Sequence, residues 1–181
     1  MRNNPFSLQY GYGDLWVTFG DYDEDYNPSP NRQYGFSFFS NSTWNNISYD
    51  SIQQTVGKPV YNLNSIAINP VNSNQAFISS FQHGMLNVIK DTSIELFDET
   101  NSALQSLELP GSSYQSIRVS DLKFDEQGML WSLTSLVEYP LKKYNTATNQ
   151  WQIFSFDAII DDPILDENGF GSLVIGRDGT K

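Results

Sequence analysis

An acidic stretch near the N-terminus places oxygen-bearing side chains at alternate positions. They are Asp21, Asp23, Asp25 and Asn27. Hard cations such as Ca²⁺ take carboxylate and amide oxygens as ligands, so this stretch is a candidate calcium site. The EF-hand pattern is incomplete, because a glycine after the third ligand and a distal glutamate are missing, and position 32 is Arg32. A solvated loop between Gly20 and Tyr34, with no metal or cofactor, is the favoured interpretation.

Two further sets of residues could do chemistry in principle. Asp161–Asp162 and Asp166–Glu167 are neighbouring carboxylates, and glycoside hydrolases need two carboxylates about 5–9.5 Å apart across a cleft. The side chains of neighbouring residues in an extended linker point in different directions, so these carboxylates are interpreted as part of a connecting loop and not as a catalytic pair. The only histidine, His83, precedes a glycine and is interpreted as a turn residue. No catalytic residue is therefore assigned, and the absence of cysteine excludes thiolate nucleophiles and Cys-ligated zinc.

The overall charge restricts the partners. The 181 residues include 10 basic and 21 acidic ones, a net charge of −11. This balance argues against binding to nucleic acid, which needs a basic patch, and against docking on an anionic membrane by charge alone. No apolar run is long enough for a transmembrane helix. No apolar stretch follows Met1–Pro5, so the sequence contains no signal peptide, and the protein is either cytosolic or exported with its signal left off.

Short aromatic or β-branched runs recur along the chain and predict strands. Trp16, Phe77 and Trp131 occupy equivalent positions in three such runs, 61 and 54 residues apart. Each run is preceded by one apolar stretch and followed by two more, with turn residues such as Asn, Asp, Gly and Pro between them. Gly84 and Gly128 lie at such turns and are expected to be structural blade residues, like the three aromatics. No sustained helical periodicity is present, and 51–57 could form at most one helical turn.

Four short strands repeated roughly every 55 residues are typical of a β-propeller. The sequence therefore predicts an all-β fold, a partial β-propeller of about three four-stranded antiparallel blades plus the first strand of a fourth. The expected blades span about 5–50, 63–99 and 118–156, and the further blade starts within 170–181. The alternative is an antiparallel sandwich with irregular spacing, which would not repeat the same aromatic strand in register.

The predicted blades assign roles to the aromatic residues. Trp16, Phe77 and Trp131 could form a platform that stacks on sugars, but their place inside strands favours packing between blades. The better candidates for an exposed aromatic surface lie near loops: Tyr10, Tyr12 and Tyr22. A propeller closes with about 4–8 blades, so three blades indicate a part of a longer protein whose other blades are partners. A chain of this length that closes by oligomerising is the alternative.

Several motifs resemble known propeller repeats. Residues 125–131 read D-E-Q-G-M-L-W and resemble the D-x-x-G-x-L-W turn of two-component-regulator propeller repeats. The order of motifs from Ile66 to Lys181 resembles most closely the PorZ-like group of type IX secretion in Bacteroidetes. Three segments carry that likeness: 68–86 resembles a D-P-x-N…S…G-L blade, 98–104 an N-S-x-L link, and 139–151 a P-L…W blade. The first 60 residues match only as a generic blade, and His83 replaces the first glycine of a Gly-Gly pair common in sensor repeats.

The resemblance implies a location in the periplasm or at the cell surface, associated with the outer membrane. In the PorZ-like group the propeller belongs to a complex that processes secreted cargo and joins it to anionic lipopolysaccharide. The first hypothesis is thus a non-enzymatic binding or scaffold module that recognises a lipopolysaccharide glycan or secretion-complex proteins. The second is the periplasmic ligand-sensing propeller of a hybrid two-component regulator. The third, an enzyme such as a lyase or glycosidase, has no recognisable site.

Overall fold

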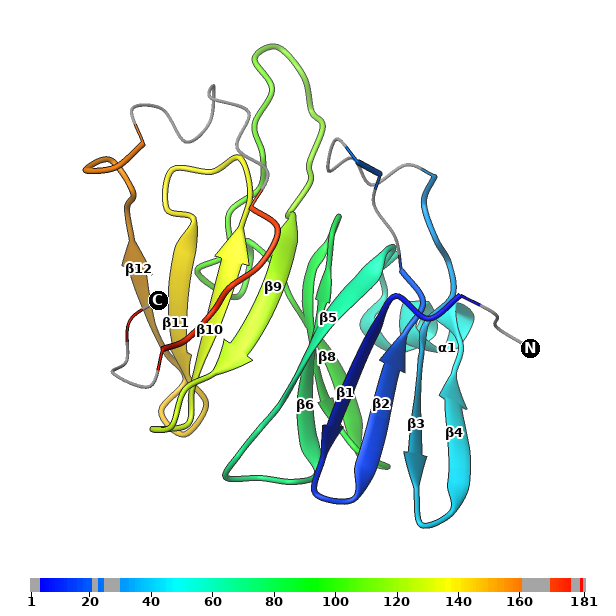
Figure 1. Cartoon of the computed structure of the whole chain (residues 1–181). Helices are drawn as coiled ribbons and strands as arrows, with labels where there is room; N and C mark the ends of the chain where they lie inside the picture. Colours follow the sequence, from blue (N-terminus) through cyan, green and yellow to red (C-terminus); the bar gives the residue numbers. More distant parts are fainter. Residues whose placement is uncertain (1–3, 21–22, 25–29, 161–169, 177–179, 181) are drawn as a thin grey trace.

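The protein consists of three four-stranded antiparallel sheets arranged as blades (Figure 1). The structure is a computed structural model that describes residues 4–20, 23–24, 30–160, 170–176 and 180. In each sheet the strands lie side by side in the order in which they follow along the chain, so each blade is a simple meander. The predicted all-β partial propeller is confirmed.

The strand bounds follow the repeats seen in the sequence. The first blade contains β1 (Ser7–Gly11), β2 (Asp14–Thr18), β3 (Phe36–Ser40) and β4 (Thr43–Ile47). The second contains β5 (Leu63–Ile68), β6 (Gln75–Ser80), β7 (Gly84–Ile89) and β8 (Ser93–Phe97). The third contains β9 (Val119–Phe124), β10 (Met129–Thr134), β11 (Leu141–Asn145) and β12 (Gln150–Phe154).

The blades pack through their aromatic residues. Between the first two blades, Trp16 stacks on Phe38 with ring centroids 4.8 Å apart and lies in one buried cluster with Ile78 and Leu86 of the second blade. A second cluster, around Phe77, joins the second and third blades. Since successive side chains of a strand point to opposite faces, each sheet can pack on both sides, and burial of both faces stabilises the stack.

Polar side chains connect neighbouring blades, from β2 to β5 and from β5 to β9. Thr18 Oγ1 donates to the carbonyl oxygen of Asn64 at 2.6 Å, and the Asn64 amide donates to the carbonyl oxygen of Ser120 at 3.0 Å. In parallel, the Ser65 hydroxyl donates to the carboxylate of Asp121. Because these groups are buried, each hydrogen bond offsets the cost of removing its partners from water. The links fix how far one blade can slide along the next.

The structure corrects the sequence-based expectation for 51–57. A helix of two turns, α1 (Tyr49–Val56), replaces the single turn, and it begins earlier. Ser48 caps it by accepting a hydrogen bond from the Ser51 N–H, and Gly57 ends it in the left-handed conformation with φ 73°. Only Tyr49 and Ile52 of the helix are buried, and an apolar stripe of two residues is too short to produce a helical period in the sequence.

The segment after the third blade is held against β9 and β10. The Leu173 N–H donates to Asp121 Oδ2 at 2.9 Å, and the Leu173 side chain is buried against Trp131, Leu133 and Leu141. No strand is assigned within the described residues 170–176. A ladder needs a second strand beside it, so the first strand of a further blade over 170–181 stays a prediction.

Candidate functional site

The two ends of the blades carry connections of different length. At one end the strands are joined by short turns, such as Tyr12–Gly13 and Asn41–Ser42. The other end carries the short β6–β7 connection but also the longest connections, which span 19–35, 48–62 and 98–118. Figure 1 shows 98–118 and the described parts of 19–35 projecting at the upper end. Since loops on a rigid scaffold commonly carry binding functions, this long-loop end is the candidate binding surface.

The connection from β8 to β9 has its own hydrogen-bonded structure. The Leu107 N–H donates to the carbonyl oxygen of Ser116 at 2.9 Å, and the Ser116 N–H donates to Ser106 Oγ at 2.9 Å. At the tip, the Ser112 N–H donates to the carbonyl oxygen of Leu109 across a Pro-Gly turn. Gly111 has φ 75°, the value that a tight turn of this kind requires. The loop is therefore a folded arm.

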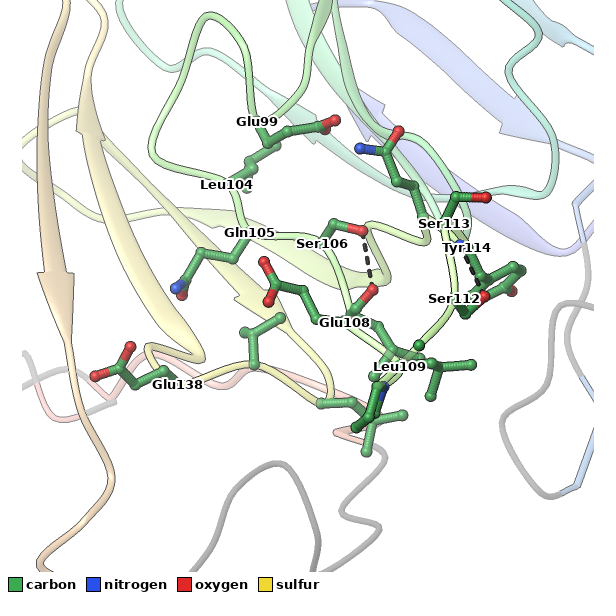
Figure 2. Close-up of a pocket in the computed structure, with 16 residues that line it drawn as sticks. Glu99, Leu104, Gln105, Ser106, Glu108, Leu109, Ser112, Ser113, Tyr114 and Glu138 are labelled. Carbon is green, nitrogen blue, oxygen red and sulfur yellow. Dashed lines mark hydrogen bonds between the residues drawn. The ribbon is translucent and has the colours of Figure 1, made fainter.

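A groove of about 860 Å³ lies between this arm and the β10–β11 turn (Figure 2). That volume is in the range of ligand sites, about 300–1,000 Å³. Its floor is apolar, formed by the buried side chains of Leu104, Leu107 and Val137. The described lining residues include three acidic side chains and no basic one; the acidic ones are Glu99, Glu108 and Glu138. The groove combines an apolar floor with a negatively charged rim.

The backbone of Tyr139 joins the two walls of the groove. The Tyr139 N–H, in the β10–β11 turn, donates to Gln105 Oε1 of the arm at 3.0 Å. On its other side, the carbonyl oxygen of Tyr139 accepts a hydrogen bond from Lys142 Nζ. Lys142 is fully buried, and burial lowers the pKa of its ammonium group to about 7. The arm is thus anchored to the third blade by the Gln105–Tyr139 hydrogen bond, and Lys142 holds the same turn from within the third blade.

Lys142 lies opposite a buried hydroxyl in the sheet. Its partner across the β10–β11 ladder is Ser132, and the buried hydroxyls of Ser132 and Thr134 have no hydrogen-bond partner among the described residues. No carboxylate pairs with the ammonium group in the salt bridges of the described residues. A buried amine without a counter-ion is costly when charged.

Replacing Lys142 with methionine is therefore expected to stabilise the fold more strongly at lower pH. The folded-state pKa, about 7, lies below the ordinary 10.5, so the unfolded chain binds more protons between these values. Wild-type stability consequently falls as pH falls from 10 to 7. The advantage of K142M should grow by roughly 3 kcal/mol over that window and level off below pH 7. Urea unfolding of both proteins at pH 6, 7, 8, 9 and 10 measures it, and a constant difference would contradict the assignment.

An aromatic cluster with the histidine lies elsewhere on the long-loop end. The rings of Tyr49 and Tyr61 stack 5.7 Å apart, and Tyr61 meets His83 edge-on at 5.0 Å. The Tyr61 N–H donates to His83 Nδ1 at 3.3 Å, which requires that nitrogen to be unprotonated. Burial lowers the pKa of His83 to about 4. His83 is thus a neutral residue of the β6–β7 connection that helps to hold α1.

The three repeat aromatics are buried. Trp16, Phe77 and Trp131 each belong to a different apolar cluster. No face of these rings is open to stack on a sugar. Gly84 and Gly128 both have positive φ, 95° and 75°, as residues at tight turns often do.

The other sequence-based candidates separate into two groups. Tyr10 and Tyr12 are exposed, but Tyr12 lies in the β1–β2 turn at the short-turn end, where its hydroxyl donates to the carbonyl oxygen of Pro70 at 2.6 Å. Several candidates lie outside the described residues: Asp21, Tyr22, Asp25, Asn27, Asp161, Asp162, Asp166 and Glu167. Among described residues no group of three or more His, Asp or Glu could hold a metal ion. The calcium site, which also includes Asp23, stays a prediction.

The groove was not among the sequence-based candidates. Its walls come from two connections, 98–118 and 135–140, that are distant from each other in the sequence. The interval between the second and third predicted blades was the available signal, because long connections in compact domains are often functional. Its acidic rim is dispersed along the chain and forms no motif.

Comparison with known proteins identifies the fold. A solved structure of PorZ, described as an essential bacterial surface component of the type IX secretion system of Porphyromonas gingivalis, matches with a TM-score of 0.81 over 98% of this chain. Sequence identity is 17%, and the chain spans 22% of the length of that protein. The resemblance to PorZ in fold is therefore shown. No protein-family profile and no curated protein sequence matches. Among the described residues, no helix is long and apolar enough to span a membrane.

Proposed function

We propose that this chain is a non-enzymatic propeller module of a cell-surface component of a type IX secretion system. The observation that carries the proposal is the match to PorZ across 98% of the chain. In this role the blades form a rigid scaffold, and the long-loop end recognises a partner. The further blades of a longer protein would pack against the first and third blades.

The electrostatics of the long-loop end bear on the choice of partner. The groove between the arm and the β10–β11 turn has an acidic rim, and the chain as a whole carries a net charge of −11. An anionic lipopolysaccharide glycan would be repelled by both, because like charges raise the free energy of the complex. These charges support a protein partner over an anionic glycan.

The location and role can be tested in the source bacterium with an epitope-tagged copy of the full-length gene. We expect protease added to intact cells to degrade the tagged protein, and deletion of the gene to reduce the amount of secreted cargo in the medium. A periplasmic marker that stays intact is the control for cell integrity. Recovery of the protein in the inner-membrane fraction, with normal cargo secretion in the deletion strain, would overturn the proposal and favour a sensor.

A further inference from the structure

We propose that the groove between 104–115 and 136–138 binds a basic, extended peptide segment of a partner protein. The inference rests on the proposed function and names the class of partner for the long-loop end. Neither the fold nor the likeness to PorZ assigns this groove a ligand.

The charges around the groove favour a cation. Glu99 and Glu108 belong to the arm and Glu138 to the opposite wall, so a ligand lying in the groove has carboxylates on both sides. Figure 2 shows these three side chains distributed around the opening. Several carboxylates near one apolar, partly enclosed space attract a lysine or arginine side chain more strongly than an isolated surface charge does.

The basic side chains near the groove already have partners. Lys142 Nζ donates to the carbonyl oxygen of Tyr139 and is fully buried. Arg118 Nε donates to Ser116 Oγ at 3.2 Å, and its guanidinium lies 6.0 Å from the ring centroid of Phe81. Lys58 pairs with Asp98 at 2.5 Å. None of these groups lines the groove. Lys58 offsets part of the charge of Glu99, and Arg118 hydrogen-bonds Tyr114 at the lip, but the three lining carboxylates leave the groove with a net negative potential.

The floor and lip suit the aliphatic parts of a peptide. Leu104, Leu107 and Val137 supply the buried apolar part of the lining, and Leu109 and Tyr114 are exposed at the lip. Lysine and arginine can lay their methylene stems on apolar surface while the charged group reaches carboxylates. The exposed Tyr114 ring offers a further contact for a cation. This arrangement matches alternating basic and aliphatic side chains.

The groove is also held open in advance. The Gln105–Tyr139 hydrogen bond fixes the distance between the walls, and Leu136, in the opposite wall, has φ 59°. A non-glycine residue in this region is strained and persists when its surroundings hold it there. A preformed groove loses less conformational entropy on binding, which favours affinity for a flexible segment.

Fluorescence anisotropy with two labelled peptides tests the proposal on the full 181-residue chain. One peptide has the sequence GKLKVKLG, and the other, GELEVELG, carries glutamate in place of lysine. We expect only the lysine peptide to bind at 50 mM NaCl, and its binding to weaken at 500 mM NaCl because salt screens exposed charges. Equal binding of the two peptides would overturn the proposal.

Two double variants with the same change in net charge locate the site. Glu99→Gln with Glu108→Gln removes two rim charges, whereas Glu95→Gln with Glu126→Gln removes two exposed charges outside the groove. We expect the first pair to weaken binding about fivefold and the second by less than about twofold. Unchanged thermal unfolding of both variants confirms that they fold. Equal effects of the two pairs would overturn the assignment to the groove.

Direct binding of a polyanion, measured without the peptides, separates a basic peptide from an anionic glycan as the ligand. Fluorescein-labelled dextran sulfate should not bind the chain, and binding of dextran sulfate without binding of the lysine peptide would overturn the proposal in favour of an anionic glycan. Absence of peptide binding by a folded chain whose full-length protein still reaches the cell surface would overturn the groove assignment alone. Failure to reach the surface would overturn the proposed function instead.

Discussion

Replacing Gly84 with alanine is expected to destabilise the protein by at least about 3 kcal/mol, a large fraction of the total stability of a domain. Gly84 begins β7 with φ 95°, a conformation that side-chain-bearing residues rarely adopt. An added Cβ would also lie 2.1 Å from the carbonyl oxygen of Phe97 and 3.3 Å from a methyl group of Leu104. The carbonyl belongs to the β8 end of the sheet and cannot move away without breaking the ladder.

Gly111→Ala is the matched control for this prediction. Gly111 also has positive φ, 75°, but no atom lies within 4 Å of the position of its Cβ. The Gly111→Ala variant should therefore lose only the free energy of unfolding that comes from the strained backbone conformation, about 1–2 kcal/mol. Urea unfolding followed by circular dichroism measures both free energies. Equal losses in the two variants would show that backbone strain alone, and not the close approach of the Phe97 carbonyl, accounts for the effect of replacing Gly84.

Replacing Asp125 with alanine is expected to cost about 3 kcal/mol. The buried Asp125 carboxylate accepts three hydrogen bonds, from the Gln127 N–H at 3.0 Å, the Met129 N–H at 2.9 Å and the Trp131 Nε1–H at 2.7 Å. Removal leaves these donors without their acceptor, at roughly 1–3 kcal/mol for each one that stays buried. The loss of order should also change the tryptophan fluorescence, since Trp131 is held by this bond.

The neighbouring Glu126→Ala serves as the control for Asp125. Glu126 is exposed, so its replacement should change the free energy of unfolding by less than about 0.5 kcal/mol. Thermal and urea unfolding of the two variants provide the comparison. A cost for D125A no larger than that for E126A would contradict a structural role for the carboxylate.

These contacts give the D-x-x-G-x-L-W sequence a physical explanation. Asp125 ties the turn to the tryptophan side chain, while the Gly128 N–H closes the turn by donating to the carbonyl oxygen of Asp125 at 3.0 Å. Trp131 is thereby oriented toward the face that also buries Leu173. The motif thus fixes an aromatic residue on a blade face.

Much of the fold was predictable because its signals are local. The runs around Trp16, Phe77 and Trp131 became β2, β6 and β10, since alternation of side chains and turn residues act within a few positions. The β-propeller class followed from the repetition of these runs. Helix α1 was not recognised, because its short buried stripe depends on the first two blades that it packs against.

The groove and the buried Lys142 were decided only by the tertiary structure. The sequence shows Glu99, Glu108 and Glu138 as isolated acidic residues in a chain that has many. Only the packing of the second blade against the third brings the arm beside the β10–β11 turn, and only that packing removes the Lys142 amine from water. Strand propensity is a property of neighbours along the chain. A groove lined by two loops and a shifted pKa instead depend on residues that are far apart in the sequence and close in space, because electrostatic and apolar interactions act through space.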